Sequence, residues 1–108
     1  MTVETTENVA EQINEVLHCV IDPELGYNIV DLGLIYDVTI ADDAVAHITM
    51  TTTTRGCPAT SYLIEGARAA AESLPSVQSV EVELTYDPPW TPSMMSSEAQ
   101  EHLGIAAR

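Results

Sequence analysis

The apolar residues of this chain change their spacing repeatedly, and this alternation constrains the fold more than any other feature. They recur at helical spacing from residue 6 to residue 20, and a second helical stripe runs from Leu63 to Leu74. Between the two stripes, and again after the second, apolar and polar residues alternate with the period of a strand. A chain patterned in this way is expected to pack helices against a small sheet.

The first half of the chain predicts a helix followed by a hairpin. The helix covers 6–20 and ends before 22–23, because the residue that precedes a proline is pushed out of the helical region. Strands are predicted from Leu34 to Ile40 and from Ala46 to Met50. The two aspartates at 42–43 form a plausible turn between them, although the glycine of the strongest hairpin signal is absent.

The second half predicts another helix, a third strand and a short last helix. Proline is favoured at the first helical position, so Pro58 would start the second helix and Cys57 would occupy its N-cap. The third strand covers 80–86, and either Ser96 or Ser97 caps the last helix. The prediction is a single domain over 1–108, a small two-layer α+β sandwich with helices packed on a three-stranded mixed sheet in the order α-β-β-α-β-α.

Charge limits the classes of partner. Seventeen acidic residues face three basic ones, and the formal net charge is −14. Such a chain repels phosphate backbones and anionic lipid heads, so neither nucleic acid nor a membrane surface is expected as a partner. The charge indicates either steering toward a basic partner or a solvated surface, and the second interpretation is favoured. An acidic N-terminus and the lack of a long apolar run predict a cytoplasmic protein.

Cys57 is the first candidate for chemistry. A thiol at a helix N-terminus lies where unpaired N–H groups and the helix dipole stabilise negative charge. This environment favours the thiolate, which is the form that binds metal. The alternative is a buried cysteine that acts as a small apolar side chain. The cap position favours the functional interpretation.

Three further features are weaker candidates. Asp22 and Glu24 flank a proline and offer hard oxygen ligands for iron, but judged alone they are more typical of a turn. Thr53 and Thr54 precede the cysteine and are placed to direct hydroxyl groups toward it. Trp90 follows two prolines and is a candidate for partner docking, although covering the core is the slightly favoured role. Cys19 and the histidines show no ligand spacing and no complete catalytic set is visible.

Four motifs in order resemble the SufT/PaaD-like metal–sulfur cluster biosynthesis family. They are DPELG at 22–26, IVDLGLI at 29–35, TTRGCP at 53–58 and DPPWTP at 87–92. The resemblance runs from about residue 9 to residue 104 and implies one functional pocket, formed by Asp22, Glu24, Leu25, Thr53, Thr54 and Cys57. Arg55 departs from the family, which often has proline there, and adds a cation near the thiol.

The resemblance implies a role in iron–sulfur cluster assembly, with iron or a cluster as transient cargo and Cys57, Glu24 and Asp22 as predicted ligands. One thiolate and two carboxylates are too few soft ligands for a stable cluster. A homodimer or the cysteines of a client protein would supply more, so a carrier, scaffold or targeting adaptor is preferred to an enzyme. Two alternatives remain: an acidic interaction module, such as a PaaD-like accessory subunit of an oxygenase system, and a thiol enzyme with Glu24 as base.

Overall fold

The computed structural model describes residues 6–41, 43–53 and 59–104. The element order is α1 (Thr6–Leu17), β1 (Ile21–Asp22), β2 (Tyr27–Asn28), β3 (Ile35–Ile40), β4 (Val45–Met50), α2 (Thr60–Glu72), β5 (Ser79–Leu84), the 3-10 turn η1 (Pro92–Met94) and α3 (Ser97–His102). None of the helices in these ranges combines the length and apolar character that crossing a bilayer requires.

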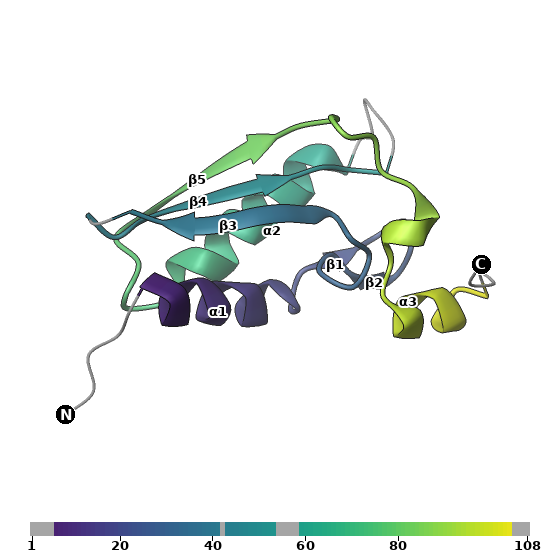
Figure 1. Ribbon diagram of the computed structural model, residues 1–108, viewed down its shortest axis with the longest axis horizontal. Helices are drawn as coiled ribbons and strands as arrows, with labels where there is room; N and C mark the ends of the chain where they lie inside the picture. The colour runs from purple at the N-terminus through teal and green to yellow at the C-terminus, as the bar shows by residue number, and fades with distance from the viewer. Residues whose placement is uncertain (1–5, 42, 54–58, 105–108) are drawn as a thin grey trace.

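The main sheet has three strands in the order β3-β4-β5. β3 and β4 form an antiparallel pair in which Val38 lies opposite Ile48. β5 lies parallel to β4, as expected for two strands joined through a helix, and pairs Val82 with Ile48. α1 and α2 lie on the same face of this sheet (Figure 1). The predicted α+β sandwich with a mixed three-stranded sheet is therefore confirmed.

The core lies between the central strand and the two long helices. Ala46, Ile48 and Met50 of β4 are fully buried, as are Ile13 of α1 and Leu63 of α2. The alternate residues of the strands point away from the helices, and most of them are polar, so the opposite face of the sheet is polar. His47 and Glu81 are neighbours on that face, with 3.3 Å between the imidazole Nδ1 and a carboxylate oxygen.

Two helix boundaries differ from the prediction. α1 ends at Leu17, and the chain continues through i→i+3 hydrogen bonds such as that from Val20 N to Leu17 O (3.1 Å). Tight turns of this kind keep Val20 close to the apolar stripe of the helix. The spacing of apolar residues in the sequence therefore does not distinguish these turns from a continued helix. α2 begins at Thr60 with Ala59 in the N-cap position, two residues after the cysteine that was predicted there.

Two connections also differ. Between the predicted first helix and the strand predicted from Leu34, where no strand was expected, the chain forms a small antiparallel ladder in which β1 pairs with β2. The turn between β3 and β4 has Ala44 at φ 64°, a conformation that glycine adopts at less cost. The absence of glycine therefore did not prevent the predicted hairpin, because an alanine takes up the left-handed conformation.

The structure assigns the cap of α3 to Ser96. Its hydroxyl accepts a hydrogen bond from Ala99 N (3.1 Å), and its own N–H donates to Asp31 O (2.7 Å). Ser96→Ala is expected to lower the free energy of unfolding by about 1 kcal/mol, because one N–H of the first turn loses its acceptor. Urea denaturation measures this change. Ser97→Ala is the matched control, since Ser97 is exposed and its substitution is expected to change stability by less than about 0.5 kcal/mol.

Candidate functional site

Asp22 organises the turn that carries the first group of candidate residues. The residue is 1% exposed, and its Oδ1 accepts hydrogen bonds from Glu24 N (2.7 Å) and Leu25 N (3.3 Å). Its carbonyl oxygen accepts another from Gly26 N (2.7 Å). Glu24 is exposed, and Leu25 is half-buried against the core. The geometry brings these three predicted residues together and gives Asp22 the turn-forming role that its position before proline indicated.

Two substitutions of Asp22 distinguish the stability that comes from its turn-forming hydrogen bonds from the stability that comes from its charge. Asp22→Ala is expected to lower the free energy of unfolding by about 2–3 kcal/mol, because the Glu24 and Leu25 N–H groups both lose a charged acceptor. Asp22→Asn keeps an oxygen in the same place and is expected to cost about 1 kcal/mol or less. Urea denaturation measures both values. Equal losses for the two variants would contradict the turn role and assign the effect to the charge itself.

The threonine run at the end of β4 forms one wall of a hollow. Thr51 and Thr52 are buried, and the Thr52 hydroxyl lies 2.8 Å from the Tyr86 hydroxyl, so that one donates a hydrogen bond to the other. Thr53 is half-buried beside them. The hollow has a volume of about 450 Å³ and is lined by Thr52, Thr53, Tyr86, Asp87, Pro89 and Trp90. We call it the threonine hollow.

Trp90 is one of the residues that line the threonine hollow. Its indole N–H donates a hydrogen bond of 2.7 Å to Leu32 O, and the ring packs against the buried core. Leu32 is fully buried, so this bond satisfies a carbonyl group that has no access to water. The indole thus has a clear structural role, as the slightly favoured interpretation expected. Its role in partner docking stays a prediction.

Cys57 and Thr54, two of the predicted site residues, lie outside the described residues, as does Arg55. The described residues stop at Thr53, in the wall of the threonine hollow, and resume at Ala59, the N-cap of α2. Among the described residues no three His, Cys, Asp or Glu side chains are grouped to hold a metal ion. Since the predicted ligand set includes Cys57, it stays a prediction.

Two hydrogen bonds connect the segment after β2 to Trp90 of the threonine hollow and to Thr51, the residue before the hollow's first threonine. Thr51 N donates to Leu34 O (2.8 Å), and the Trp90 indole donates to Leu32 O. The β1–β2 ladder, the start of α2 and the segment after β5 all lie toward the same end of the long axis of the molecule (Figure 1). The Asp22 turn and the threonine hollow therefore belong to one end of the domain.

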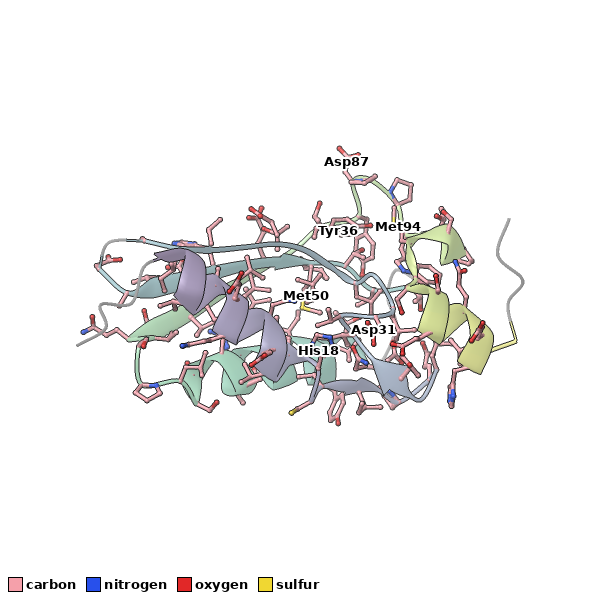
Figure 2. All side chains as sticks on the ribbon, turned by 60° about the horizontal axis from the view of Figure 1, so that its bottom comes forward. His18, Asp31, Tyr36, Met50, Asp87 and Met94 are labelled. Carbon is pink, nitrogen blue, oxygen red and sulfur yellow. The ribbon has the colours of Figure 1, made fainter. Side chains whose placement is uncertain are left out.

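The surroundings of this end are acidic. The pKa of Tyr27 is raised above its ordinary value by desolvation and by the nearby carboxylates of Asp31 and Glu98. Asp31 accepts a hydrogen bond from the Asn28 amide (2.9 Å), and one of its carboxylate oxygens lies 4.0 Å from His18 Nε2. Figure 2 shows His18 and Asp31 close together where α1 meets the β2 region. The described part of the chain contains one arginine or lysine, Arg68, which donates to Val80 O (3.2 Å).

Sequence reasoning missed Tyr86 and Thr52 as residues of the site. The pairing of the two parallel strands indicates that these residues lie together, because Met50 at the end of β4 pairs with Leu84 at the end of β5. Thr52 and Tyr86 each lie two residues beyond these ends, so an equal offset brings their hydroxyl groups together. That signal depends on the pairing register, which the sequence alone did not supply.

Comparison with known proteins identifies a family model and several similar proteins. A family model described as an iron–sulfur cluster assembly protein matches residues 10–84. The Fe–S protein maturation auxiliary factor YitW of Bacillus subtilis is 44% identical over 99 residues, covering 92% of this chain and 97% of that protein. The Fe–S protein maturation auxiliary factor SufT of Staphylococcus aureus is 42% identical over 87 residues, covering 81% of this chain and 99% of that protein.

A solved structure supports the fold. The crystal structure of a domain of unknown function, DUF59, from Bacillus anthracis superposes with a TM-score of 0.88 at 39% sequence identity. The match covers 94% of this chain and 96% of that chain. The SufT-like resemblance inferred from the four motifs and the α+β architecture are both confirmed by these findings.

Proposed function

This chain belongs to the iron–sulfur cluster assembly protein family, and we propose that it acts in the cytoplasm as a maturation factor for iron–sulfur proteins through the thiolate of Cys57. The two curated relatives described above carry the same kind of role in their names. The single observation that supports this chemistry is the threonine hollow, because the segment that contains Cys57 follows directly from its wall.

The hollow provides a suitable environment for sulfur chemistry. It opens beyond the carboxyl ends of the parallel strands β4 and β5, where the residues of two separate connections meet. Hydroxyl groups are hydrogen-bond donors that can stabilise negative charge on sulfur, such bonds tune iron–sulfur centres, and the hydroxyl-bearing residues Thr52, Thr53 and Tyr86 line this hollow. The α2 N-terminus follows within a few residues of Cys57 and favours its thiolate form.

The proposed cargo is iron or an iron–sulfur cluster, held transiently. One thiolate with the carboxylates of Asp22 and Glu24 supplies a mixed and incomplete ligand set for a cluster, since clusters normally bind several thiolates. The cysteines of a client protein, or Cys57 of a second copy in a homodimer, complete the set. Weak retention suits a carrier, because a factor that delivers a cluster must also release it.

The test of this function is the activity of iron–sulfur enzymes in cells that lack the gene. Deletion is expected to lower the activity of a [4Fe–4S] enzyme such as aconitase, and the wild-type gene on a plasmid is expected to restore it. A dehydrogenase without a cluster is the control, and its activity is expected to stay unchanged. Unchanged aconitase activity in the deletion strain under aerobic growth and iron limitation contradicts the proposal.

A second measurement separates cluster handling from the alternative of an interaction module. Anaerobic reconstitution of the purified protein with iron and sulfide is expected to produce sulfide-to-iron charge-transfer absorption and bound iron. The Cys57→Ser variant is expected to lose both signals, because serine is not ionised at neutral pH. A wild-type protein that binds no iron, but still restores the deletion strain, supports the interaction module instead.

A further inference from the structure

A groove follows the free edge of β3 and is separate from the threonine hollow. It consists of two hollows that share Ile35 and Tyr36. The first has a volume of about 500 Å³ and is lined by Gly33, Ile35, Tyr36, Pro88 and Met94. The second has a volume of about 380 Å³ and is lined by Ala10, Glu11, Asn14 and residues 35–38. We call the two hollows together the edge groove.

The edge groove exposes a strand that has one neighbour. β3 is the terminal strand in the order β3-β4-β5, so no other strand of the described chain pairs with its outer side. Four consecutive residues, 35–38, line the second hollow. Side chains alternate between the two faces of a strand, so a hollow that touches all four lies at the strand edge. An edge of this kind has backbone N–H and C=O groups directed outward for an added strand.

The wall of the first hollow is held in place by Tyr36. The pairing of β3 with β4 is irregular between Ile35 and Asp37, and such bulges redirect the side chain at that point. The Tyr36 hydroxyl donates to Pro88 O (2.7 Å) and also lies 3.7 Å from Met94 Sδ. Figure 2 shows Tyr36 beside Met94, with Asp87 above them. A preformed wall lowers the ordering cost of binding.

The chemistry of the edge groove is apolar at one end and acidic at the other. Pro88 and Met94 expose apolar atoms in the first hollow, and Met94 is 36% exposed. The second hollow is bordered by the exposed carboxylates of Glu11 and Asp37. No basic side chain lines either hollow in the described part of the chain. With a net charge of −14 in addition, the groove complements a basic segment.

We propose that the edge groove binds an extended segment of a partner protein that carries lysine or arginine, by addition of a strand to β3. An apolar side chain of the segment occupies the hollow at Pro88 and Met94, and a basic side chain lies near Glu11 and Asp37. A second copy of this chain does not fit this role, because pairing two β3 edges brings the same carboxylates together. Like charges across a strand pair are destabilising.

The position of the groove links it to the threonine hollow. Pro88 lines the edge groove, whereas Pro89 and Trp90 line the threonine hollow. One short segment therefore forms a wall of both, and a partner bound along β3 lies next to the threonine hollow. Binding to the groove goes beyond the proposed function and does not require Cys57.

The test uses a synthetic nine-residue peptide in which valine and lysine alternate, titrated into ¹⁵N-labelled protein at low salt. The expected result is saturable binding with chemical-shift changes concentrated at the amides of 35–40 and at Met94. A peptide with glutamate in place of lysine, and the lysine peptide with alternate N-methylated amides, are both expected to bind at least about tenfold more weakly. Shift changes that map to α2 or to the His47 face of the sheet overturn the proposal.

Charge-reversal variants test the surface itself. The double variant Glu11→Lys, Asp37→Lys is expected to weaken binding of the lysine peptide by about tenfold or more. Glu65→Lys, Glu101→Lys is the matched control, because both residues are exposed, lie outside the groove and change the net charge equally. A change below about threefold is expected for the control. Equal weakening in both double variants overturns the proposal in favour of non-specific attraction.

Two further measurements complete the test. Met94→Ala is expected to weaken the peptide by about threefold to tenfold, because Met94 is exposed and forms the apolar wall. Sedimentation of the free protein tests whether a second copy of this chain occupies the groove instead. A dimer in which the amides of 35–40 are protected from hydrogen exchange overturns the assignment to a partner protein. Cys57→Ser is expected to bind the peptide normally, so failure of the cluster role and failure of the groove are distinguishable.

Discussion

Cys57→Ser is expected to reduce activation of an iron–sulfur client to the level seen with an empty vector in the deletion strain. Serine keeps the size and local polarity of cysteine, but its hydroxyl is not ionised at neutral pH and is a poor ligand for iron. The expected loss is complete because Cys57 is the only cysteine of the four motifs. Aconitase activity in extracts, normalised to aconitase protein, measures the effect.

Cys19 provides the matched control for this experiment. It is the other cysteine of the chain, and its side chain is exposed just beyond the end of α1. Cys19→Ser makes the same chemical change in the same protein and is expected to restore the client fully. Circular dichroism and urea denaturation establish that both variants fold. Full restoration by Cys57→Ser, or equal losses for the two variants, contradicts the thiolate mechanism.

Gly33→Ala is expected to lower the free energy of unfolding by about 3 kcal/mol, because the added methyl group brings both a conformational cost and a steric clash. Gly33 has φ +80°, a conformation that costs alanine about 1–2 kcal/mol. A Cβ atom there also clashes with the Met94 carbonyl oxygen and lies 2.8 Å from the Met94 carbonyl carbon. Both are backbone atoms, so η1 must move away from the start of β3.

Gly26→Ala separates the conformational cost of a positive φ from the steric clash with Met94. Gly26 has φ +69°, and no atom lies within 4 Å of a Cβ added there. It therefore carries the conformational cost alone, and a loss of about 1–2 kcal/mol is expected. The difference between the two variants in urea denaturation measures the close approach of Gly33 to Met94. Equal losses would contradict that approach.

Much of the fold was predictable from the sequence because the main elements are amphipathic. The stripes that contain Ile13 and Leu63 are buried against the alternating residues Ala46, Ile48 and Met50, and each of these five is fully buried. A period of 3.6 or of 2 in the apolar residues identifies the type of element and also the face that becomes buried. The mixed sheet followed from one further rule, that a helix between two strands allows them to lie parallel.

The boundaries and the small elements were not predictable in the same way. Val20 lies close to the helical stripe although α1 ends at Leu17, because the following i→i+3 turns have similar spacing. The two-residue strands β1 and β2 are too short to show a period. Ser96 and Ser97 were equal candidates for the cap, and the hydrogen bond to Ala99 N decided between them. Local interactions of this kind leave no repeat in the sequence.

The single pocket inferred for the candidate site stays a prediction. The motifs around Asp22 and Thr53 indicated residues of one pocket, and the structure places Asp22 in a turn and Thr53 in the threonine hollow. The pairing of Thr52 with Tyr86 was missed because 33 residues separate them in the chain. Cys57 and Thr54 were named from the motif and its position before α2, and their roles stay predictions.

The sequence by itself determined the secondary-structure classes, the buried faces, the acidic character and the family, because periodicity, composition and short motifs are local properties of a chain. The tertiary structure alone decided which strand is left at the edge, which prolines face which hollow and how near Gly33 comes to Met94. These features depend on the register between distant segments, and register is set by packing of the whole core rather than by any one stretch of residues.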